Sequence, residues 1–347
     1  MDTNIIFYFS RKGEFSLSAI PVLEIKKLKT SFFSSEEEIP AVDEISFSVQ
    51  KGEIIGIVGE SGCGKSVTSL SIMRLIPQPP GKIVSGEICL NGENIANVSE
   101  KRMRQIRGNE IAMIFQEPMT SLNPLFTIGN QMIEAILLHK KITKKEALQQ
   151  SVEMLKLVGL SRAEQIMKDY PHQLSGGMRQ RVMIAMALSC NPGLLIADEP
   201  TTALDVTIQA QILALMRDLN KKFKTSIIMI THDLGVVEEV CQRVIVMYAG
   251  KIVEEGRVDV IFKNPKHPYT VGLLQSIPDV RVKKERLFSI QGNVPKPGSI
   301  TKGCRFAARC NFVQERCLSE NPPLFRAEEE HHYVRCFLHN EGGGEND

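Results

Sequence analysis

The run from Gly59 to Ser66, Gly-Glu-Ser-Gly-Cys-Gly-Lys-Ser, combines residue types that bind phosphate. It fits the pattern G-x-x-x-x-G-K-[ST], in which glycines let backbone N–H groups turn inward around phosphate oxygens. A buried strand is expected before it, from Ile54 to Val58, and a helix after it, from Val67 to Leu75, with its positive end toward the phosphates. We expect Lys65 on the β- and γ-phosphates of a nucleotide and the Ser66 hydroxyl on Mg²⁺. The residues expected at the phosphates are Gly59, Glu60, Ser61, Gly62, Cys63, Gly64, Lys65, Ser66 and Val67.

Two carboxylates follow another predicted strand. Leu194 to Ala197 is a short apolar run typical of a buried strand, and Asp198 and Glu199 come directly after it. Asp198 is expected to hold Mg²⁺ through water, and Glu199 to orient or deprotonate the water that attacks a terminal phosphate. His232 follows the predicted strand Ser226 to Ile230, at the sheet edge where ligands bind in open α/β folds. These side chains together predict nucleotide hydrolysis.

A second group of phosphate-binding residues lies further along the chain. Ser175, Gly176 and Gly177 precede a predicted helix from Met178 to Ser189, so a hydroxyl and backbone amides gather at a helix N-terminus. The chain already has one phosphate site, and a second one for its own nucleotide would be redundant.

The remaining pattern indicates an α/β fold. Alternation from Ala41 to Val49 predicts a half-buried strand, and Val244 to Met247 predicts another. Residues 127–189 have helical apolar spacing. Residues 207–221 predict an amphipathic helix with its apolar face toward the core.

Taken in order, these motifs resemble those of the nucleotide-binding subunits of ATP-binding-cassette (ABC) transporters over about residues 22 to 340. The resemblance implies a P-loop NTPase core with an antiparallel β subdomain and a helical subdomain that carries the signature motif. It pairs Phe32, or the adjacent Phe33, with the aromatic residue that stacks on adenine, and a buried aromatic side chain without adenine contact is the alternative. It pairs Gln116 with the glutamine that senses the γ-phosphate, binds Mg²⁺ and contacts the permease. The other matches are Ser175 to Gln180 with the signature, Ala203-Leu204-Asp205 with the loop after the catalytic glutamate, and His232 with the switch histidine.

The resemblance also implies partners. In the family, two subunits form a head-to-tail dimer in which each signature closes over the ATP of the other, and hydrolysis lets the dimer open. Repair and chromosome-tethering members carry a long coiled coil, but no sustained heptads occur between residues 66 and 175.

The runs from Phe115 to Pro124 and from Lys266 to Thr270 resemble the dipeptide and oligopeptide permease ATPases. That subfamily implies a second ATPase subunit, a paralogue of this chain, together with two transmembrane permease subunits and an external peptide-binding protein. It also implies a peripheral position on the cytoplasmic face of the inner membrane. An importer subunit for nickel or another small solute stays open, as does a soluble regulatory ATPase with a redox-sensing tail.

Composition sets bounds on these interpretations. The 347 residues are 43% hydrophobic and 24% charged, which is ordinary for a soluble protein of about two domains. A net charge of +2 gives no basic field for nucleic acid, and no apolar run approaches the length of a membrane span. We expect an N-terminal tail at 1–21, a nucleotide-binding domain at 22–263 with its helical subdomain at about 127–189, and a small Cys-rich extension at 264–347.

Four of the eight cysteines lie in that extension with the spacing Cys304-x5-Cys310-x6-Cys317-x18-Cys336. Because a reducing cytosol disfavours disulfides, four thiolates there favour tetrahedral zinc or a [4Fe–4S] cluster, and the spacing does not decide between them. The resemblance implies the cluster, whereas the nearby His331, His332 and His339 favour zinc, and an extension without metal is the third reading.

The other four cysteines are interpreted separately. Cys63 is expected to be reactive, with a pKa lowered by Lys65 and the loop amides. Cys89, Cys190 and Cys241 are expected to be small buried hydrophobic residues.

Overall fold

The computed structural model describes residues 20–34, 37–116, 121–202, 204–277, 289–327, 329 and 331–339. Parts of four sequence predictions lie outside these residues: most of the N-terminal tail, residues 117–120 of the run that begins at Phe115, Ala203, and residues 278–288, 328, 330 and 340–347 of the expected extension.

The larger sheet, within the described residues, has eight strands in the order β11-β12-β10-β9-β3-β8-β7-β6. Strands β6, β7, β8, β3 and β9 pair in parallel, and β10, β12 and β11 continue the sheet in antiparallel pairs. Every residue of β3, β7 and β8 is buried, as expected for parallel strands covered on both faces. The strands are β3 (Ile54–Val58), β6 (Ile111–Ile114), β7 (Leu194–Asp198), β8 (Ser226–Ile230), β9 (Arg243–Tyr248), β10 (Lys251–Arg257), β11 (Phe325–Arg326) and β12 (Tyr333–Val334).

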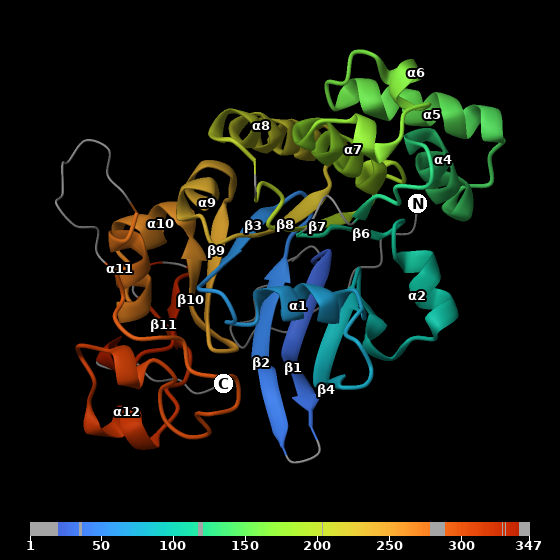
Figure 1. Cartoon of the computed structure of the whole chain (residues 1–347). Coiled ribbons are helices and arrows are strands. Elements are labelled where there is room, and N and C mark those ends of the chain that lie inside the picture. Colours follow the sequence, from blue (N-terminus) through green and yellow to red (C-terminus); the bar gives the residue numbers. More distant parts are fainter. Residues whose placement is uncertain are drawn as a thin grey trace, which may run out of the picture.

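A smaller antiparallel sheet packs against one face of the larger one (Figure 1). Its order is β2-β1-β4-β5, and β2 shows the half-buried alternation predicted from the sequence. Helix α1 contacts β1 and β2 on one side and β7 on the other, and therefore lies between the two sheets. The elements here are β1 (Leu23–Phe33), β2 (Glu38–Val49), β4 (Gly81–Leu90), β5 (Glu93–Asn94), α1 (Lys65–Ile72) and α2 (Glu100–Ile106).

Helices cover the other face of the larger sheet, with a second hydrophobic core beneath them. Helices α4 to α7, drawn in green at the top of Figure 1, fall within the stretch predicted to be helical. Helix α8 buries Ile212 and Leu219 on its apolar face, as predicted. The bounds are α4 (Ile128–His139), α5 (Lys144–Leu157), α6 (Ala163–Ile166), α7 (Gly176–Leu188), α8 (Val206–Phe223), α9 (Leu234–Val240) and α10 (Val258–Lys263). The short 3₁₀ helices are η1 (Ile95–Asn97), η2 (Pro171–Gln173), η3 (Ala307–Arg309) and η4 (Phe337–His339).

The chain after residue 263 packs back onto the larger sheet. It contains α11 (Pro268–Gln275) and α12 (Glu315–Ser319), and it supplies β11 and β12. Glu254 of β10 pairs with Val334 of β12, so this segment extends the main sheet. Its buried side chains include Phe306 and Phe337. The sequence did not predict this sheet extension.

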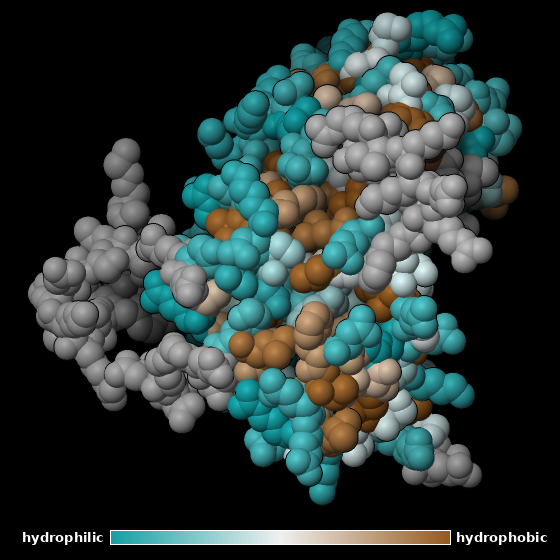
Figure 2. All heavy atoms as spheres, turned by 90° about the vertical axis from the view of Figure 1, so that its left-hand side faces the viewer, coloured by the Kyte–Doolittle hydropathy of each residue, from teal (hydrophilic) through white to brown (hydrophobic). Residues whose placement is uncertain are grey.

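On the face shown in Figure 2, hydrophobic side chains are visible in the middle and hydrophilic ones surround them. Among the described helices, none is long and apolar enough to span a bilayer.

Candidate active site

The loop of residues 59–66, which we call the phosphate loop, makes a tight turn between β3 and α1. Gly59 has φ +152° and Gly64 has φ +104°, values that L side chains rarely adopt. A Cβ at Gly59 would lie 2.2 Å from the Met247 carbonyl oxygen, and one at Gly64 would lie 2.6 Å from that of Ala41. Only glycine fits at these two positions. Helix α1 begins at Lys65, two residues before the predicted start, so the amides of Lys65 and Ser66 belong to its first turn.

Lys65 lies against the loop. Its Nζ donates hydrogen bonds to the carbonyl oxygens of Gly59 at 2.7 Å and Glu60 at 3.1 Å. The side chain of Cys63 is buried at 0% exposure, and burial raises the pKa of its thiol although Lys65 opposes the shift. The prediction of a reactive Cys63 with a lowered pKa is therefore wrong, because desolvation of the thiolate outweighs the nearby positive charge.

Two oxygen donors meet at the end of β7. Ser66 Oγ lies 3.3 Å from Asp198 Oδ1, and Ser69 Oγ lies 3.4 Å from Asp198 Oδ2. Asp198 is 4% exposed, and burial raises the pKa of its carboxyl group, with the neighbouring Glu199 acting in the same direction. A carboxylate and a hydroxyl at hydrogen-bond distance, beside the phosphate loop, form the kind of hard-oxygen pair that Mg²⁺ takes.

Glu199 sits in a left-handed backbone conformation, with φ +48°. Its carboxylate accepts hydrogen bonds from Thr202 Oγ1 at 2.9 Å and Gln116 Nε2 at 3.2 Å, and it lies 3.1 Å from His232 Nδ1. Burial acts to raise the pKa of Glu199, but the bonds from Thr202 and His232 outweigh it and the pKa is lowered. The carboxylate is therefore ionised at neutral pH and able to accept a proton.

Lys65, Ser66 and Glu199 line one cleft of about 760 Å³, whereas Asp198 and Cys63 do not. Its walls include most of the predicted site and three residues that the sequence patterns missed, Ile39, Ala41 and Pro297. Phe32 lines the cleft, whereas Phe33 does not and is 43% exposed. The lining residues predicted from the sequence are Phe32, Ser61, Gly62, Gly64, Lys65, Ser66, Val67, Gln116, Glu199 and His232.

The signature residues do not line this cleft. Ser175 is the N-cap of α7 and accepts a hydrogen bond from the Met178 amide at 3.3 Å. Ser175 and Gly176 are exposed, and a Cβ at Gly177 would lie 3.0 Å from Ile208 of α8. Asp205 is likewise outside the cleft and caps α8 through the Ile208 amide. The helix N-terminus of α7 therefore presents its amides at the surface.

All four cysteines of the extension line one small cavity, next to His267 and Phe306. Backbone amides of Phe312 and Gln314 donate to the sulfur atoms of Cys310 and Cys317. The cysteine positions lining the cavity are Cys304, Cys310, Cys317 and Cys336. Burial raises the pKa of the Cys336 thiol to about 11, and it also raises the pKa values of Cys304 and Cys310.

Within the described part of the chain, no group of three or more His, Cys, Asp or Glu side chains is placed to hold a single metal ion. His332 pairs with Glu254 and His339 bonds to the Lys266 carbonyl oxygen. Neither of them lines the cysteine cavity, and neither does His331. Cys89, Cys190 and Cys241 are buried, as predicted.

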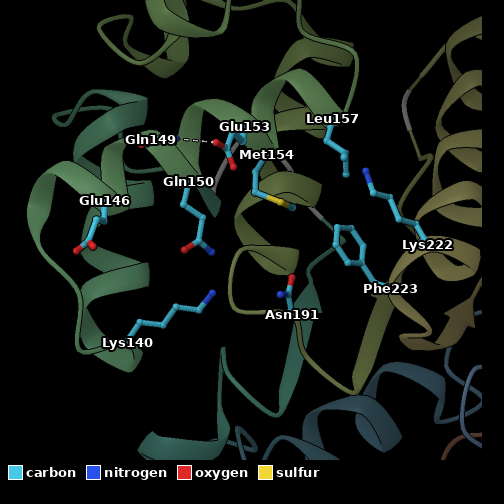
Figure 3. Close-up of a pocket in the computed structure, with 10 residues that line it drawn as sticks. All are labelled: Lys140, Glu146, Gln149, Gln150, Glu153, Met154, Leu157, Asn191, Lys222 and Phe223. Atoms are coloured by element: carbon cyan, nitrogen blue, oxygen red, sulfur yellow. Dashed lines mark hydrogen bonds between the residues drawn. The ribbon is translucent and has the colours of Figure 1, made fainter.

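Another cavity lies between α5 and the end of α8 (Figure 3). The side chains of Lys140, Gln150 and Asn191 point toward the same space in Figure 3. Lys140 and Gln150 both donate to the Ser189 carbonyl oxygen. Neither the phosphate loop nor Asp198 or Glu199 lines it, so it is separate from the candidate active site.

Comparison with known proteins supports the same interpretation. Residues 42–202 match the family model described as ABC transporter, and residues 253–317 match the one described as oligopeptide/dipeptide transporter, C-terminal region. The chain is 57% identical to the oligopeptide transport ATP-binding protein AppD of Bacillus subtilis (strain 168), over 93% of this chain and 98% of that protein. It is 50% identical to the dipeptide transport ATP-binding protein DppD of the same organism, over 91% of this chain and 94% of the relative. A dimeric structure of the ATP-binding cassette MJ0796, in a post-hydrolysis state bound to ADP and Pi, superposes with a TM-score of 0.61 at 28% identity, covering 68% of this chain and 98% of that one.

We predict that Phe32→Ala weakens ATP binding by roughly three- to tenfold, because ring stacking contributes about 0.5–1.5 kcal/mol. Phe33→Ala is the matched control, since its side chain lies outside the cleft, and it should change affinity by less than about twofold. Equilibrium binding of MgATP to the purified chain measures both. A larger loss for Phe33→Ala than for Phe32→Ala would reverse the assignment.

We predict that Glu199→Gln retains ATP binding but lowers single-turnover hydrolysis by more than about a hundredfold, because an amide keeps the shape yet cannot accept a proton. Glu238→Gln, on the exposed side of α9, is the control and should hydrolyse ATP at the wild-type rate. If Glu199→Gln slows hydrolysis by less than about tenfold, about 1.4 kcal/mol of barrier, Glu199 is not the base.

Proposed function

The chain belongs to the ATP-binding subunits of peptide ABC transporters, and we propose that it hydrolyses ATP to power the uptake of dipeptides or oligopeptides through membrane permease subunits. The observation that carries the proposal is the single cleft that contains the phosphate loop together with Gln116, Glu199 and His232. The match of residues 253–317 to the oligopeptide/dipeptide transporter C-terminal region supports peptides as the substrate class.

Each side chain of the cleft has a proposed role. Lys65 exchanges its bonds to the loop carbonyls for the β- and γ-phosphates, and the first-turn amides of α1 bind the remaining oxygens. Ser66 and Gln116 would bind Mg²⁺, and Asp198 would hold it through water. Mg²⁺ there would neutralise charge that develops on the β- and γ-phosphate oxygens.

Glu199 is the proposed general base. Its lowered pKa keeps it ionised, and Thr202 and Gln116 fix its carboxylate through hydrogen bonds. His232 contacts the same carboxylate from the end of β8, and this position supports its role as the switch residue that reports the γ-phosphate. Phe32 is the proposed adenine platform.

The exposed signature favours an active site completed by another subunit. Ser175, Gly176 and Gly177 present amides at the surface, apart from the cleft of their own chain. The buried Gln180 of the same helix donates to the Pro200 carbonyl oxygen at 2.6 Å, next to Glu199. If the partner's nucleotide binds at the N-terminus of α7, Gln180 would therefore connect that helix to the segment of this chain that carries Glu199. Asp205 stays a proposed member of the same interface.

The proposed assembly contains a second ATPase subunit, a paralogue, with two transmembrane permease subunits and an external peptide-binding protein. We place this chain on the cytoplasmic face of the membrane as a peripheral subunit. The division into 1–21, 22–263 and 264–347 is part of the proposal. Uptake of nickel or another small solute is the alternative substrate class, and a regulatory ATPase with a redox-sensing tail is the alternative of a different kind.

For the extension we propose a [4Fe–4S] cluster held by Cys304, Cys310, Cys317 and Cys336. The four cysteines line one cavity, which supports a shared multi-thiolate centre, and the resemblance to the peptide-permease ATPases favours the cluster over zinc. Amides already donate to two of the sulfur atoms, as they do around clusters. When bound, such a cluster would cross-link the loops of the extension through four iron–thiolate bonds.

The proposed function predicts that the tagged chain, purified from detergent-solubilised membranes, carries a second ATPase subunit and two polytopic permeases. Reconstituted in vesicles, this complex should hydrolyse ATP faster when a peptide-loaded binding protein is added, and the Glu199→Gln complex should show no such response. Stimulation by nickel instead of peptide would indicate the other substrate class. Recovery of the chain only from the soluble fraction would overturn the transport assignment.

The cluster predicts that anaerobically purified protein contains roughly four irons per chain. Cys310→Ser should lose most of the iron and unfold at a lower temperature, because the loops lose a cross-link. Cys89→Ser, at a buried cysteine outside the cavity, is the control for iron content. Stoichiometric zinc without iron, or metal-free fresh protein, would contradict the cluster.

A further inference from the structure

The phosphate loop is contacted by a side chain from the extension. Arg309, the residue before Cys310, forms a two-pronged ion pair with Glu60, in which Nη1 lies 2.6 Å from Oε2 and Nη2 lies 3.0 Å from Oε1. The two residues are 249 positions apart in the chain. Parallel N–H donors on both carboxylate oxygens fix the orientation of Glu60 as well as its distance.

The Arg309 side chain is held on every side. It is 5% exposed, and its Nε donates to the Gln291 carbonyl oxygen at 2.9 Å. It also donates to Tyr248 Oη at 3.3 Å and to the Ile290 carbonyl oxygen at 3.2 Å. The bond to Glu60 is the largest influence on its pKa, which is raised. A guanidinium with its donors already placed gives Glu60 a rigid partner.

A second contact from the chain after residue 263 holds the main chain of the same loop residue. The Glu60 amide donates to Tyr269 Oη at 2.8 Å. Tyr269 of α11 is 0% exposed and packs against Tyr248 and Phe306, with ring centroids 4.7 and 5.4 Å away. Glu60 is therefore fixed at both its backbone and its side chain by residues outside the core motif.

The position of Glu60 affects Lys65. The Glu60 carbonyl oxygen accepts a bond from Lys65 Nζ at 3.1 Å. Tyr269 and Arg309 hold the amide and the carboxylate of this same residue. A shift of Glu60 would move one wall of the phosphate loop and the ammonium group with it. Phosphate binding depends on backbone amides that are oriented toward the phosphate before it binds. A more mobile loop therefore binds the nucleotide less tightly.

We propose that Arg309 and Tyr269 are positioning residues of the nucleotide site, so that the extension holds the phosphate loop in its binding geometry. The inference rests on the proposed ATP site and deepens it. Arg305, which directly follows Cys304, bonds to Asp43 and to the Ala249 carbonyl oxygen, so both ends of the segment between the first two cysteines are attached to the cassette. A well-ordered cysteine cavity would thereby hold Arg309 in place, and Arg309 would in turn hold the phosphate loop in its nucleotide-binding conformation.

The test is a double-mutant cycle on the full-length chain, with MgATP affinity as the readout. Arg309→Gln and Glu60→Gln should each weaken affinity by about tenfold, as expected for loss of a charge-assisted pair. The double variant should be no weaker than either single one, since both remove the same interaction. Tyr269→Phe should weaken affinity by a smaller factor. Arg326→Gln, at an exposed arginine of the extension, is the matched control and should bind MgATP as the wild type does.

A second readout separates positioning from general destabilisation. In the assembled transporter, Arg309→Gln and Glu60→Gln should raise the KM for ATP by about tenfold and change kcat by less than about twofold, because Glu199 is untouched. Should Arg309→Gln fail to fold, Glu60→Gln at the loop surface carries the same prediction.

Three results would decide against the inference or the function. Wild-type affinity in folded Arg309→Gln, or additive losses in the double variant, would overturn the positioning role while leaving the ATPase assignment intact. Absence of MgATP binding by the wild-type chain would overturn the proposed nucleotide site itself.

Discussion

The tight turn of the phosphate loop is the constraint on which the rest of the site depends. Gly59 is pressed against the end of β9 and Gly64 against Ala41 of β2, at distances that leave no room for a Cβ. The loop is therefore fixed where the two sheets meet. These two contacts fix the position of Lys65 at the start of α1. They also fix the orientation of the loop amides that we propose bind phosphate.

The parallel pairing of β7 and β8 brings Glu199 and His232 together across the cleft from the phosphate loop. Asp198 is in register with Ile230, so Glu199 and His232 leave neighbouring strands at the same edge. Glu199 adopts a positive φ there, a conformation that costs about 1–3 kcal/mol in a non-glycine residue and survives only when its surroundings fix it. Its amide bonds to the Ile230 carbonyl oxygen, and its carboxylate to Thr202 and Gln116. The strain is thus located at the residue that we propose as the general base.

The sequence predicted those parts of the site that depend on residues close together in the chain. Strands β3 and β8 begin and end where the apolar runs placed them, because buried parallel strands are continuous apolar segments. Pro297, which lines the cleft, and Thr202, which bonds to Glu199, were missed, since nothing in their own neighbourhoods marks them as part of the site. The pKa of Cys63 was predicted in the wrong direction because burial, which opposes the effect of Lys65, is not visible in the sequence. The contact of Arg309 with Glu60 spans most of the chain and leaves no local signal.

Contacts between residues far apart in the sequence also hold the extension next to the phosphate loop. Glu254 of β10 is 0% exposed, and its carboxylate accepts bonds from the amides of Lys266 and His267 and pairs with His332 Nε2. Burial acts to raise the pKa of Glu254, but these partners outweigh it and lower the pKa, so the core of the sheet contains a charge satisfied by the chain after residue 263. Burial also lowers the pKa of His267 to about 4, so its neutral ring can accept from the Tyr269 amide and cap α11. One buried carboxylate thereby anchors the helix that sets Tyr269 against Glu60. Without the chain after residue 263, Glu254 would therefore lie uncompensated in the core, and Glu60 would lose its contacts with Arg309 and Tyr269.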